Sequence, residues 1–309
     1  MPEILHEVTP LWRSLPLERA LGVPVQLKME ALQPGGSFKI RGIGRLCVNA
    51  VAQGYGSLVS SSGGNAGVAT AYAGWRLGVP ATVYVFAGVP EAALARMREY
   101  GAEVVHAGAG WQEAHEAASA AAAERGAYYV HPFDHPDIWA GHSTLVDEMA
   151  ASGPLAETIV LAVGGGGLLA GVLDGLQRHG HTGRVVAVET HGTASLHAAL
   201  AAGKLVRLER IASIAKTLGA AQVAEGAFQR AQRRGVQSVL VSDAQALAAA
   251  RQFALDHRVL VEPAAGAALA AVYERLGPVA QASSVAVIVC GGAGIALRDE
   301  IFAYPPVPA

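Results

Sequence analysis

Cysteine is scarce in this sequence, since only Cys47 and Cys290 occur among 309 residues. Two cysteines are too few for a disulfide framework, and this usage is typical of a reducing compartment. No apolar run approaches the roughly 20 residues that a membrane-spanning helix needs. The first residues, MPEILHEVTPLWRS, lack the basic and apolar regions of a secretion signal. We therefore expect a cytoplasmic protein that has no membrane partner.

Charge is also sparse and nearly balanced. Charged residues make up 16% of the sequence, and the formal net charge is -2. Such a chain has no broad positive field to attract nucleic acid or anionic lipid. Hydrophobic residues make up 52%, which argues against disorder, and the length suffices for one large domain or two smaller ones. We expect a globular protein whose partners are small molecules.

Glycine, by contrast, is abundant. The sequence has 37 glycines, about 12% of the chain against an average of about 7%. Many of them gather in four short clusters, at residues 35–36, 63–67, 164–167 and 291–294. These clusters are the first candidates for ligand-binding loops.

Short β-branched runs alternate with Ala/Leu-rich stretches of helical length, the pattern of parallel strands joined by helices. Strands are expected at 57–60, 81–86, 103–106, 159–163, 185–189, 239–241 and 285–289. Helices are expected at 66–77, 91–100, 111–125, 168–178, 244–256 and 264–275. The sequence therefore predicts an α/β fold.

The segment HPFDHPDIWAGH, residues 131–142, indicates a change of domain. Its two prolines interrupt regular structure before a helix expected to begin near His142. The histidines His131, His135 and His142 are an alternative metal cluster. The prolines argue against it, because they prevent the single helical face that would bring the three rings together.

The run IVLAVGGGGLLAGVL, residues 159–173, predicts an anion site. Backbone N–H groups of residues 164–167 can bind phosphate oxygens at the N-terminus of a helix that begins at about Leu168. A glycine turn that only allows close packing is the plainer alternative. A dinucleotide site is a second one, because Gly165 to Ala170 fit G-x-G-x-x-A and Glu189 lies at the spacing of a ribose-binding acid.

The run PGGSFKIRG places Lys39 in the first turn of a helix that Ser37 is expected to cap. The positive end of a helix and any burial both disfavour the charged amine, so Lys39 is expected to lose its proton readily. A neutral amine can react with a carbonyl. Taken alone, such a lysine is more often a solvated side chain.

Two further glycine-rich joints follow expected strands. In SSSGGNAG, Asn65 is expected to cap a helix, and backbone donors from Ser62 to Ala66 can hold a carboxylate. In VCGGAG, the glycines after Cys290 leave room for a flat ring, although a lone cysteine is more often a small buried residue.

Together, and in this order, GGSFKIRG, SSGGNAG, VGGGGLLAG and VCGGAG resemble the serine/threonine dehydratases among the fold type II, tryptophan synthase β-like, enzymes that use pyridoxal phosphate (PLP). The resemblance extends over most of the chain and is strongest to the liver-type L-serine dehydratases. It implies two open, twisted, mostly parallel sheets flanked by helices, with PLP in the cleft between two domains. Residues 1–36 and 135–309 would form the large domain, and residues 37–134 the small one.

The resemblance also implies an activity and its residues. The expected reaction is α,β-elimination of water from L-serine or L-threonine, which gives pyruvate or 2-oxobutanoate plus ammonia. Lys39 would be the catalytic residue that binds PLP covalently. The other PLP-binding residues would be Phe38, Asn65, Gly164, Gly165, Gly166, Gly167, Leu168 and Cys290. The substrate loop would comprise Ser62, Gly63, Asn65 and Ala66.

Family members usually form homodimers and bind a monovalent cation, so the resemblance implies a homodimer and potassium. The cation ligands would be Gly164, Glu189, Thr193, Leu218 and Ala220, mostly through main-chain oxygens. A strand-ending acid that faces solvent is the plainer alternative for Glu189, because acids are usually exposed.

Some positions depart from the family pattern. Gly63 stands where related serine racemases have serine and liver-type dehydratases commonly have alanine, so we expect extra space there and slower turnover. Ala293 and Gly294 replace a Ser-Asn pair, which removes hydrogen bonds near the ring. Other fold type II reactions stay open as alternatives, namely β-replacement, threonine synthesis and racemisation, as does a PLP-binding protein without turnover.

Overall fold

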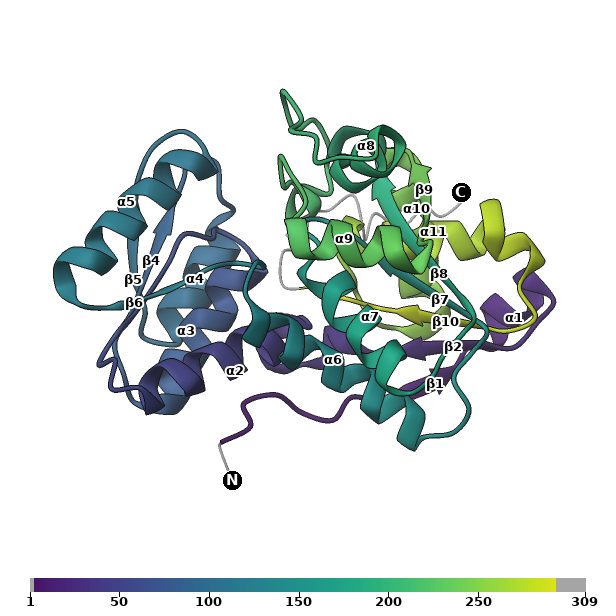
Figure 1. Cartoon of the computed structure of the whole chain (residues 1–309), viewed down its shortest axis with the longest axis horizontal. Helices are drawn as coiled ribbons and strands as arrows, with labels where there is room; N and C mark the ends of the chain where they lie inside the picture. The colour runs from purple at the N-terminus through teal and green to yellow at the C-terminus, as the bar shows by residue number, and fades with distance from the viewer. Residues whose placement is uncertain (1–2, 293–309) are drawn as a thin grey trace, which may run out of the picture.

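The computed structural model describes residues 3–292, and within them the strands form two sheets (Figure 1). The larger sheet has six strands in the order β1-β2-β10-β7-β8-β9. The strands are β1 (Leu11–Arg13), β2 (Val25–Lys28), β10 (Val285–Ile288), β7 (Thr158–Ala162), β8 (Arg184–Thr190) and β9 (Gln237–Val241). Only β1 runs antiparallel to its neighbour.

The smaller sheet has four parallel strands in the order β5-β4-β3-β6. They are β5 (Glu103–His106), β4 (Ala81–Val85), β3 (Leu58–Ser60) and β6 (Tyr128–Val130). All four fall between residues 58 and 130, whereas the strands of the larger sheet lie before and after this segment. The proposed domain limits at residues 37 and 134 stay a prediction.

Helices cover both sheets. In the larger sheet α11 packs on β7, β8 and β10, and α1 and α10 pack on α11, while Figure 1 shows α7 in front of the strands with α6 and α9 beside it. In the smaller sheet α3 and α5 pack on β3 and β4. The helices are α1 (Leu15–Leu21), α2 (Lys39–Ala52), α3 (Asn65–Leu77), α4 (Glu91–Glu99), α5 (Trp111–Arg125), α6 (Pro136–Ala151), α7 (Gly167–Arg178), α8 (Ser195–Ala202), α9 (Glu225–Arg234), α10 (Asp243–His257) and α11 (Pro263–Tyr273).

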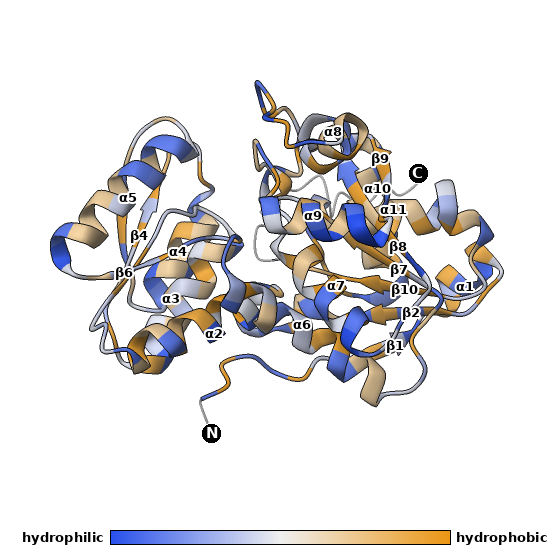
Figure 2. Cartoon of the chain, in the orientation of Figure 1, coloured by the Kyte–Doolittle hydropathy of each residue, from blue (hydrophilic) through white to orange (hydrophobic). Residues whose placement is uncertain are grey.

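Each sheet has its own apolar core. The central strands β10 and β7 of the larger sheet are apolar along almost their whole length (Figure 2), as expected for parallel strands covered on both faces. In the smaller sheet neighbouring residues alternate between faces: Leu58 and Val83 pack towards α3, whereas Val59 and Tyr84 pack towards α5. Within residues 3–292 no helix has the length and apolar character to cross a membrane.

The predicted α/β fold with two mostly parallel sheets is confirmed. All seven expected strands and all six expected helices are present, with ends that differ by at most two residues from the prediction. The short strands β1, β2 and β6 were not predicted, nor were α1, α8 and α9. Runs of three or four residues carry too little periodicity to identify a strand from sequence.

The expected start of α6 near His142 was wrong. The helix begins at Pro136, and the His135 side chain accepts a hydrogen bond from the Asp137 N–H at 3.1 Å. Proline is well tolerated at the first position of a helix, because the N–H that it lacks would have no partner there. Pro136 therefore starts this helix instead of interrupting it.

Two glycines allow α2 and α6 to cross closely. A Cβ on Gly42 would lie 2.6 Å from the Ile138 carbonyl oxygen, and a Cβ on Gly141 would overlap the Arg41 carbonyl oxygen. The two backbones thus pack directly against each other. Through this crossing, α2 is attached to α6, which packs on α7 beside the larger sheet.

We predict that Gly141→Ala destabilises the protein. Alanine favours a helix over glycine by roughly 1 kcal/mol, but the added methyl group meets backbone atoms that cannot rotate away. Overpacking of this kind costs about 1–3 kcal/mol, and each kcal/mol lowers Tm by about 2–4 °C in a chain of this size. Thermal unfolding of Gly141→Ala and of Gly56→Ala, where the added Cβ would meet no atom within 4 Å, checks this. Equal Tm values for the two variants would contradict it.

Candidate active site

Lys39 is the first residue of α2, and its half-buried side chain points to the segment that follows β6. Its Nζ donates a hydrogen bond to the Pro132 carbonyl oxygen at 2.6 Å. The Phe38 ring lies beside the amine, with Nζ 5.2 Å from the ring centroid. The amine is therefore held where the two sheets meet.

Burial lowers the pKa of Lys39 to about 8, although the nearby Cys290 and Glu262 act in the opposite direction. Removing an ammonium group from water disfavours its charged form. The expected readiness of Lys39 to lose its proton is thus matched by its surroundings. Above about pH 8 the neutral amine, which is the nucleophilic form, predominates.

The backbone before Lys39 is tied to the end of β10. Phe38 N donates to the Cys290 carbonyl at 3.0 Å, and Gly292 N donates to the Gly36 carbonyl at 2.9 Å. Ser37 pairs with Gly291 as an isolated antiparallel bridge. The prediction that Ser37 caps α2 was wrong, because its extended backbone joins this bridge and the helix begins after Phe38 without a side-chain cap.

Asn65 is likewise not a cap, contrary to the prediction. It is the first residue of α3, and the N-cap position is taken by Gly64, with no side-chain cap bond. Asn65 Nδ2 donates to Glu262 Oε1 at 2.7 Å, and Thr217 Oγ1 donates to the same oxygen at 2.9 Å. Asn65 Oδ1 is buried and has no hydrogen-bond partner. A buried polar atom without a partner is costly, which indicates a missing ligand group.

The loop from Ser62 to Ala66 leads from β3 into α3, so it lies at the positive end of that helix. Ser62 Oγ accepts from Gly64 N at 3.4 Å. The extra space expected at Gly63 is absent, because a Cβ there would overlap Cγ2 of Val89, a half-buried residue. The side chain of Val89 fills the volume that an alanine methyl group would take.

The second glycine loop joins β7 to α7, as predicted, and Gly166 adopts φ +87° at the helix start. Leu168 follows in the first turn of α7 and is buried. A Cβ on Gly167 would lie 2.5 Å from the Phe133 carbonyl oxygen, and a Cβ on Gly165 would overlap the Phe133 ring. The loop is therefore backbone without side chains, packed against Phe133 at the N-terminus of α7, where helix N–H groups lack partners within the helix.

Contacts through neighbouring residues bring the predicted site residues together in one place. On one side Phe133 packs on the glycine loop, and its neighbour Pro132 holds the amine of Lys39. On the other side Glu262 binds Asn65, and its backbone N–H donates to the Gly291 carbonyl at 3.2 Å. The amine, the glycine loop, the Asn65 amide and Cys290 thus surround one region between the two sheets.

Cys290, two residues after the end of β10, is the last of these site residues. It is 4% exposed and is not part of a disulfide, and burial raises the pKa of its thiol. The thiol is therefore neutral at physiological pH. Ala293 and Gly294, the other expected departures from the family pattern, lie outside the described residues.

Glu189 is buried, so the alternative that it faces solvent was wrong. Its two carboxylate oxygens accept backbone N–H bonds from Leu196 at 2.9 Å and His197 at 2.7 Å, at the start of α8. Burial raises the pKa of Glu189 to about 7 despite these bonds. A cation close to this carboxyl group would favour its charged form.

The other residues expected to bind a cation lie near Glu189. Val163 N donates to the Val188 carbonyl at 2.9 Å, so the residues that follow these two, Gly164 and Glu189, lie close together near the ends of β7 and β8. A Cβ on Gly164 would lie 3.2 Å from the Leu218 carbonyl oxygen, which accepts the Ala220 N–H at 2.8 Å. Thr193 follows in the 3₁₀ turn His191–Thr193, where its Oγ1 bonds Thr190 Oγ1 at 2.8 Å.

The three histidines considered as a metal cluster have separate environments. His131 Nδ1 accepts from Asp134 N at 2.8 Å, His135 caps α6, and His142 is fully buried with both ring nitrogens unpaired. Among residues 3–292 no group of three or more His, Cys, Asp or Glu side chains is arranged to hold a metal ion.

Comparison with known proteins identifies the class to which this site belongs. Residues 3–291 match the family model described as pyridoxal-phosphate dependent enzyme. The chain belongs to this family, which confirms the predicted one. The match favours PLP over a dinucleotide as the ligand of the glycine loop.

Individual relatives are more specific. The human protein named serine dehydratase-like is 47% identical over 96% of this chain and 93% of its own length. Human L-serine dehydratase/L-threonine deaminase is 45% identical over 96% of this chain and 94% of its own length. The crystal structure of an L-serine ammonia-lyase from the fungus Rhizomucor miehei matches with a TM-score of 0.92 at 37% identity and covers 97% of this chain and 99% of that one.

The residues of the site fit PLP. A phosphate suits the bare N–H groups at the start of α7, an aldehyde suits the Lys39 amine with its lowered pKa, and a ring oxygen suits the open hydrogen-bonding position of Asn65. Side chains at the four loop glycines would occupy space next to Phe133, Leu218 or Ala227. Each part of the cofactor therefore meets a group of matching chemistry.

Several contributing residues were not predicted. Pro132 and Phe133 act through backbone carbonyls and packing, for which a sequence gives no signal. Glu262 and Thr217 hold the Asn65 amide. The sequence contains one signal for Glu262. It is the one charged residue in an otherwise apolar run, VEPAAGAALAAV, and an acid in such a run is unusual enough to indicate a role.

We predict that Gly63 and Val89 are coupled. Gly63→Ala should lower the free energy of unfolding by about 1–3 kcal/mol through overpacking, and Val89→Ala should restore most of this loss in the double variant. Urea unfolding of the two single variants and the double variant checks this through their interaction energy, expected to exceed about 0.5 kcal/mol. Additive effects would mean that the two side chains do not compete for one volume.

Proposed function

We propose that this chain is an L-serine/L-threonine ammonia-lyase, which converts L-serine to pyruvate or L-threonine to 2-oxobutanoate and releases ammonia. The observation that carries the proposal is the buried Lys39 amine, with a pKa of about 8, beside a bare glycine loop at a helix N-terminus. The names of the human and fungal relatives support the choice of reaction and substrates. The products are those of a lyase that removes a β-hydroxyl group.

Each PLP-facing role is supported by a feature of the site. Residues 164–168 bind the phosphate through N–H groups at the start of α7, Asn65 offers its amide to the ring oxygen, and Phe38 packs against the ring. Cys290 lies beside the ring nitrogen, and its raised pKa keeps this thiol neutral. When bound, PLP supplies a carbonyl that takes the substrate amino group and a ring that withdraws electrons from Cα.

The substrate is held and deprotonated by residues of this chain. The N–H groups of Ser62, Asn65 and Ala66, with the Ser62 hydroxyl, bind the carboxylate at the positive end of α3. Gly63 belongs to the same substrate loop. The neutral Lys39 amine removes the proton from Cα of the substrate. This form of the amine predominates above about pH 8. A neutral Cys290 would stabilise positive charge on the ring nitrogen only weakly, which would suit elimination of the β-hydroxyl group.

The other fold type II reactions are less well supported. Racemisation needs a second proton-handling group on the opposite face, and Gly63 provides no hydroxyl there. β-Replacement and threonine synthesis need a second nucleophile or a phosphorylated substrate. Release of ammonia from serine alone distinguishes the proposed reaction from these, and from a PLP-binding protein without turnover.

We also propose potassium as a second ligand, bound by Gly164, Glu189, Thr193, Leu218 and Ala220. Hard cations prefer oxygen ligands, and the carbonyl of Leu218 lies against Gly164 at the end of β7. The buried Glu189 carboxyl, with its pKa raised to about 7, would be stabilised in its charged form by such a cation. The site adjoins the glycine loop, so occupancy would affect how the loop binds phosphate.

Compartment and assembly are proposals too. Both cysteines are free, in keeping with the reducing conditions of the cytoplasm. A homodimer rests on the family resemblance alone.

We predict that Lys39→Ala abolishes both PLP binding and ammonia release. Loss of the proton transfer alone costs about 10²–10⁴-fold in rate, and loss of covalent attachment adds to this. Visible absorbance of the purified protein and pyruvate or 2-oxobutanoate formation from each substrate check it. Lys204→Ala, which alters an exposed lysine, is the matched control. Retained turnover in Lys39→Ala would refute the proposed mechanism.

We predict that replacing potassium by tetramethylammonium at equal ionic strength lowers kcat/KM several-fold, because this ion is too large for a cage of backbone carbonyls. The comparison is made for serine and threonine in turn, with potassium added back as the control. An unchanged kcat/KM in both salts would contradict the cation proposal and leave the lyase proposal intact.

A further inference from the structure

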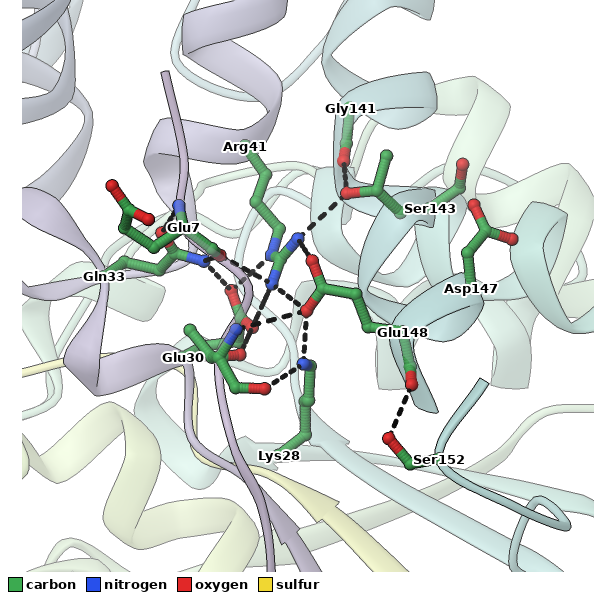
Figure 3. Close-up of polar contacts among 12 residues, drawn as sticks. Glu7, Lys28, Glu30, Gln33, Arg41, Gly141, Ser143, Asp147, Glu148 and Ser152 are labelled. Atoms are coloured by element: carbon green, nitrogen blue, oxygen red, sulfur yellow. Dashed lines mark hydrogen bonds and ion pairs between the residues drawn. The ribbon is translucent and has the colours of Figure 1, made fainter. Parts of the chain in front are cut away.

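A buried cluster of charged side chains surrounds Arg41, two residues after Lys39 (Figure 3). We call it the Arg41 cluster; its members are Lys28, Glu30, Arg41 and Glu148. They come from β2, the 3₁₀ turn Glu30–Leu32, α2 and α6. The proposed chemistry uses none of them.

Arg41 lies between the two carboxylates and bonds each of them twice. It donates to Glu30 at 2.7 and 2.8 Å and to both oxygens of Glu148 at 2.7 Å. It also donates to Thr144 Oγ1 at 3.0 Å. The side chains of Arg41 and Glu30 are 0% exposed. Two bidentate pairs fix the guanidinium plane in position and orientation.

The second cation completes the charge balance of the cluster. Lys28 Nζ bonds Glu148 and donates to the Thr9 carbonyl at 2.7 Å. Burial pushes the pKa of Glu148 upward, but the bonds to Arg41 and Lys28 outweigh burial and lower it. The cluster therefore contains two basic side chains, Lys28 and Arg41, and two acidic ones, Glu30 and Glu148.

The start of α2 lacks the usual side-chain stabilisation of a helix N-terminus. Phe38 provides no side-chain cap, and the first turn contains no acidic residue. Instead it contains Lys39 and Arg41, whose positive charges are unfavourable at the positive end of a helix. The carboxylates of Glu30 and Glu148 supply from neighbouring elements the negative charge that this turn lacks.

Both ends of the segment around Lys39 are consequently attached to the larger sheet. Before Lys39, the backbone bonds Cys290 and Gly292. After it, Arg41 bonds Glu30, next to β2, and Glu148, on α6. A buried ion pair gives little net stability compared with apolar packing, and geometric specificity is one reason to retain it.

We propose that Arg41 is a positioning residue for Lys39: its paired bonds to Glu30 and Glu148 hold the first turn of α2, and so the Lys39 amine, in reach of the cofactor carbonyl. This inference rests on the proposed role of Lys39. It requires the fork of the guanidinium as well as the charge, because a lysine ammonium group cannot bond two carboxylates in the same plane.

The test compares Arg41→Lys with Arg45→Lys in the PLP-loaded enzyme. Arg45 is on the same helix, but its side chain is 52% exposed and lies 3.8 Å from Asp137. For Arg41→Lys we expect kcat to fall by about tenfold or more, since a displacement of ~1 Å can cost about 10²-fold, with KM within about twofold. Arg45→Lys should keep both constants.

Hydrogen exchange supplies a readout that does not depend on activity. In Arg41→Lys, amides of residues 38–45 should exchange about tenfold faster or more, while those of β7 and α7 keep their wild-type rates. Equal acceleration in both regions, or wild-type exchange and kcat, would overturn the proposal. If Arg41→Lys does not fold, Glu148→Gln and Thr144→Val, which each remove part of the same contacts, replace it under the same criteria.

The outcomes separate this inference from the proposed function. If the wild-type protein binds PLP but does not release ammonia from serine or threonine, the lyase proposal fails. The exchange rates and the visible absorbance of bound PLP in Arg41→Lys still decide whether Arg41 positions Lys39. Wild-type absorbance and exchange in that variant would refute its role.

Discussion

The first turn of α2 is held to the larger sheet on both sides of Lys39, and the site depends on this attachment. Backbone bonds to residues 290–292 hold the chain before the lysine, and the buried ion pairs of Arg41 hold it after. Removing one partner of a buried pair typically costs about 3–5 kcal/mol, so this turn cannot shift cheaply. The reactive amine is therefore held in a fixed position between the two sheets.

The remaining site groups are arranged around that fixed amine. The segment 131–133 carries two of the links, because Pro132 binds Lys39 and Phe133 packs on the glycine loop. Glu262 carries a third link between the sheets through the Asn65 amide. Burial makes the Lys39 amine more nucleophilic at neutral pH, because it lowers the pKa of this group to about 8. Position and reactivity thus have the same structural origin.

Sequence reasoning found the long elements and the glycine loops, because periodicity and turn chemistry are local properties. It failed where a longer-range contact overrides a local preference. Ser37 and Asn65 are natural helix caps, yet one joins a bridge to Gly291 and the other bonds Glu262. The space expected at Gly63 is filled by Val89, which lies 26 positions further along the chain. The backbone carbonyl of Pro132 has no residue type that would reveal it.

The most direct measurement is to identify the residue that holds the cofactor. Borohydride reduction of the PLP-loaded protein fixes PLP on the amine that binds it, and digestion with mass spectrometry then locates the modified lysine. The sequence contains only four lysines, Lys28, Lys39, Lys204 and Lys216, so the assignment is unambiguous. This account predicts modification at Lys39 alone. Modification at any of the other three, with Lys39 unmodified, would contradict it.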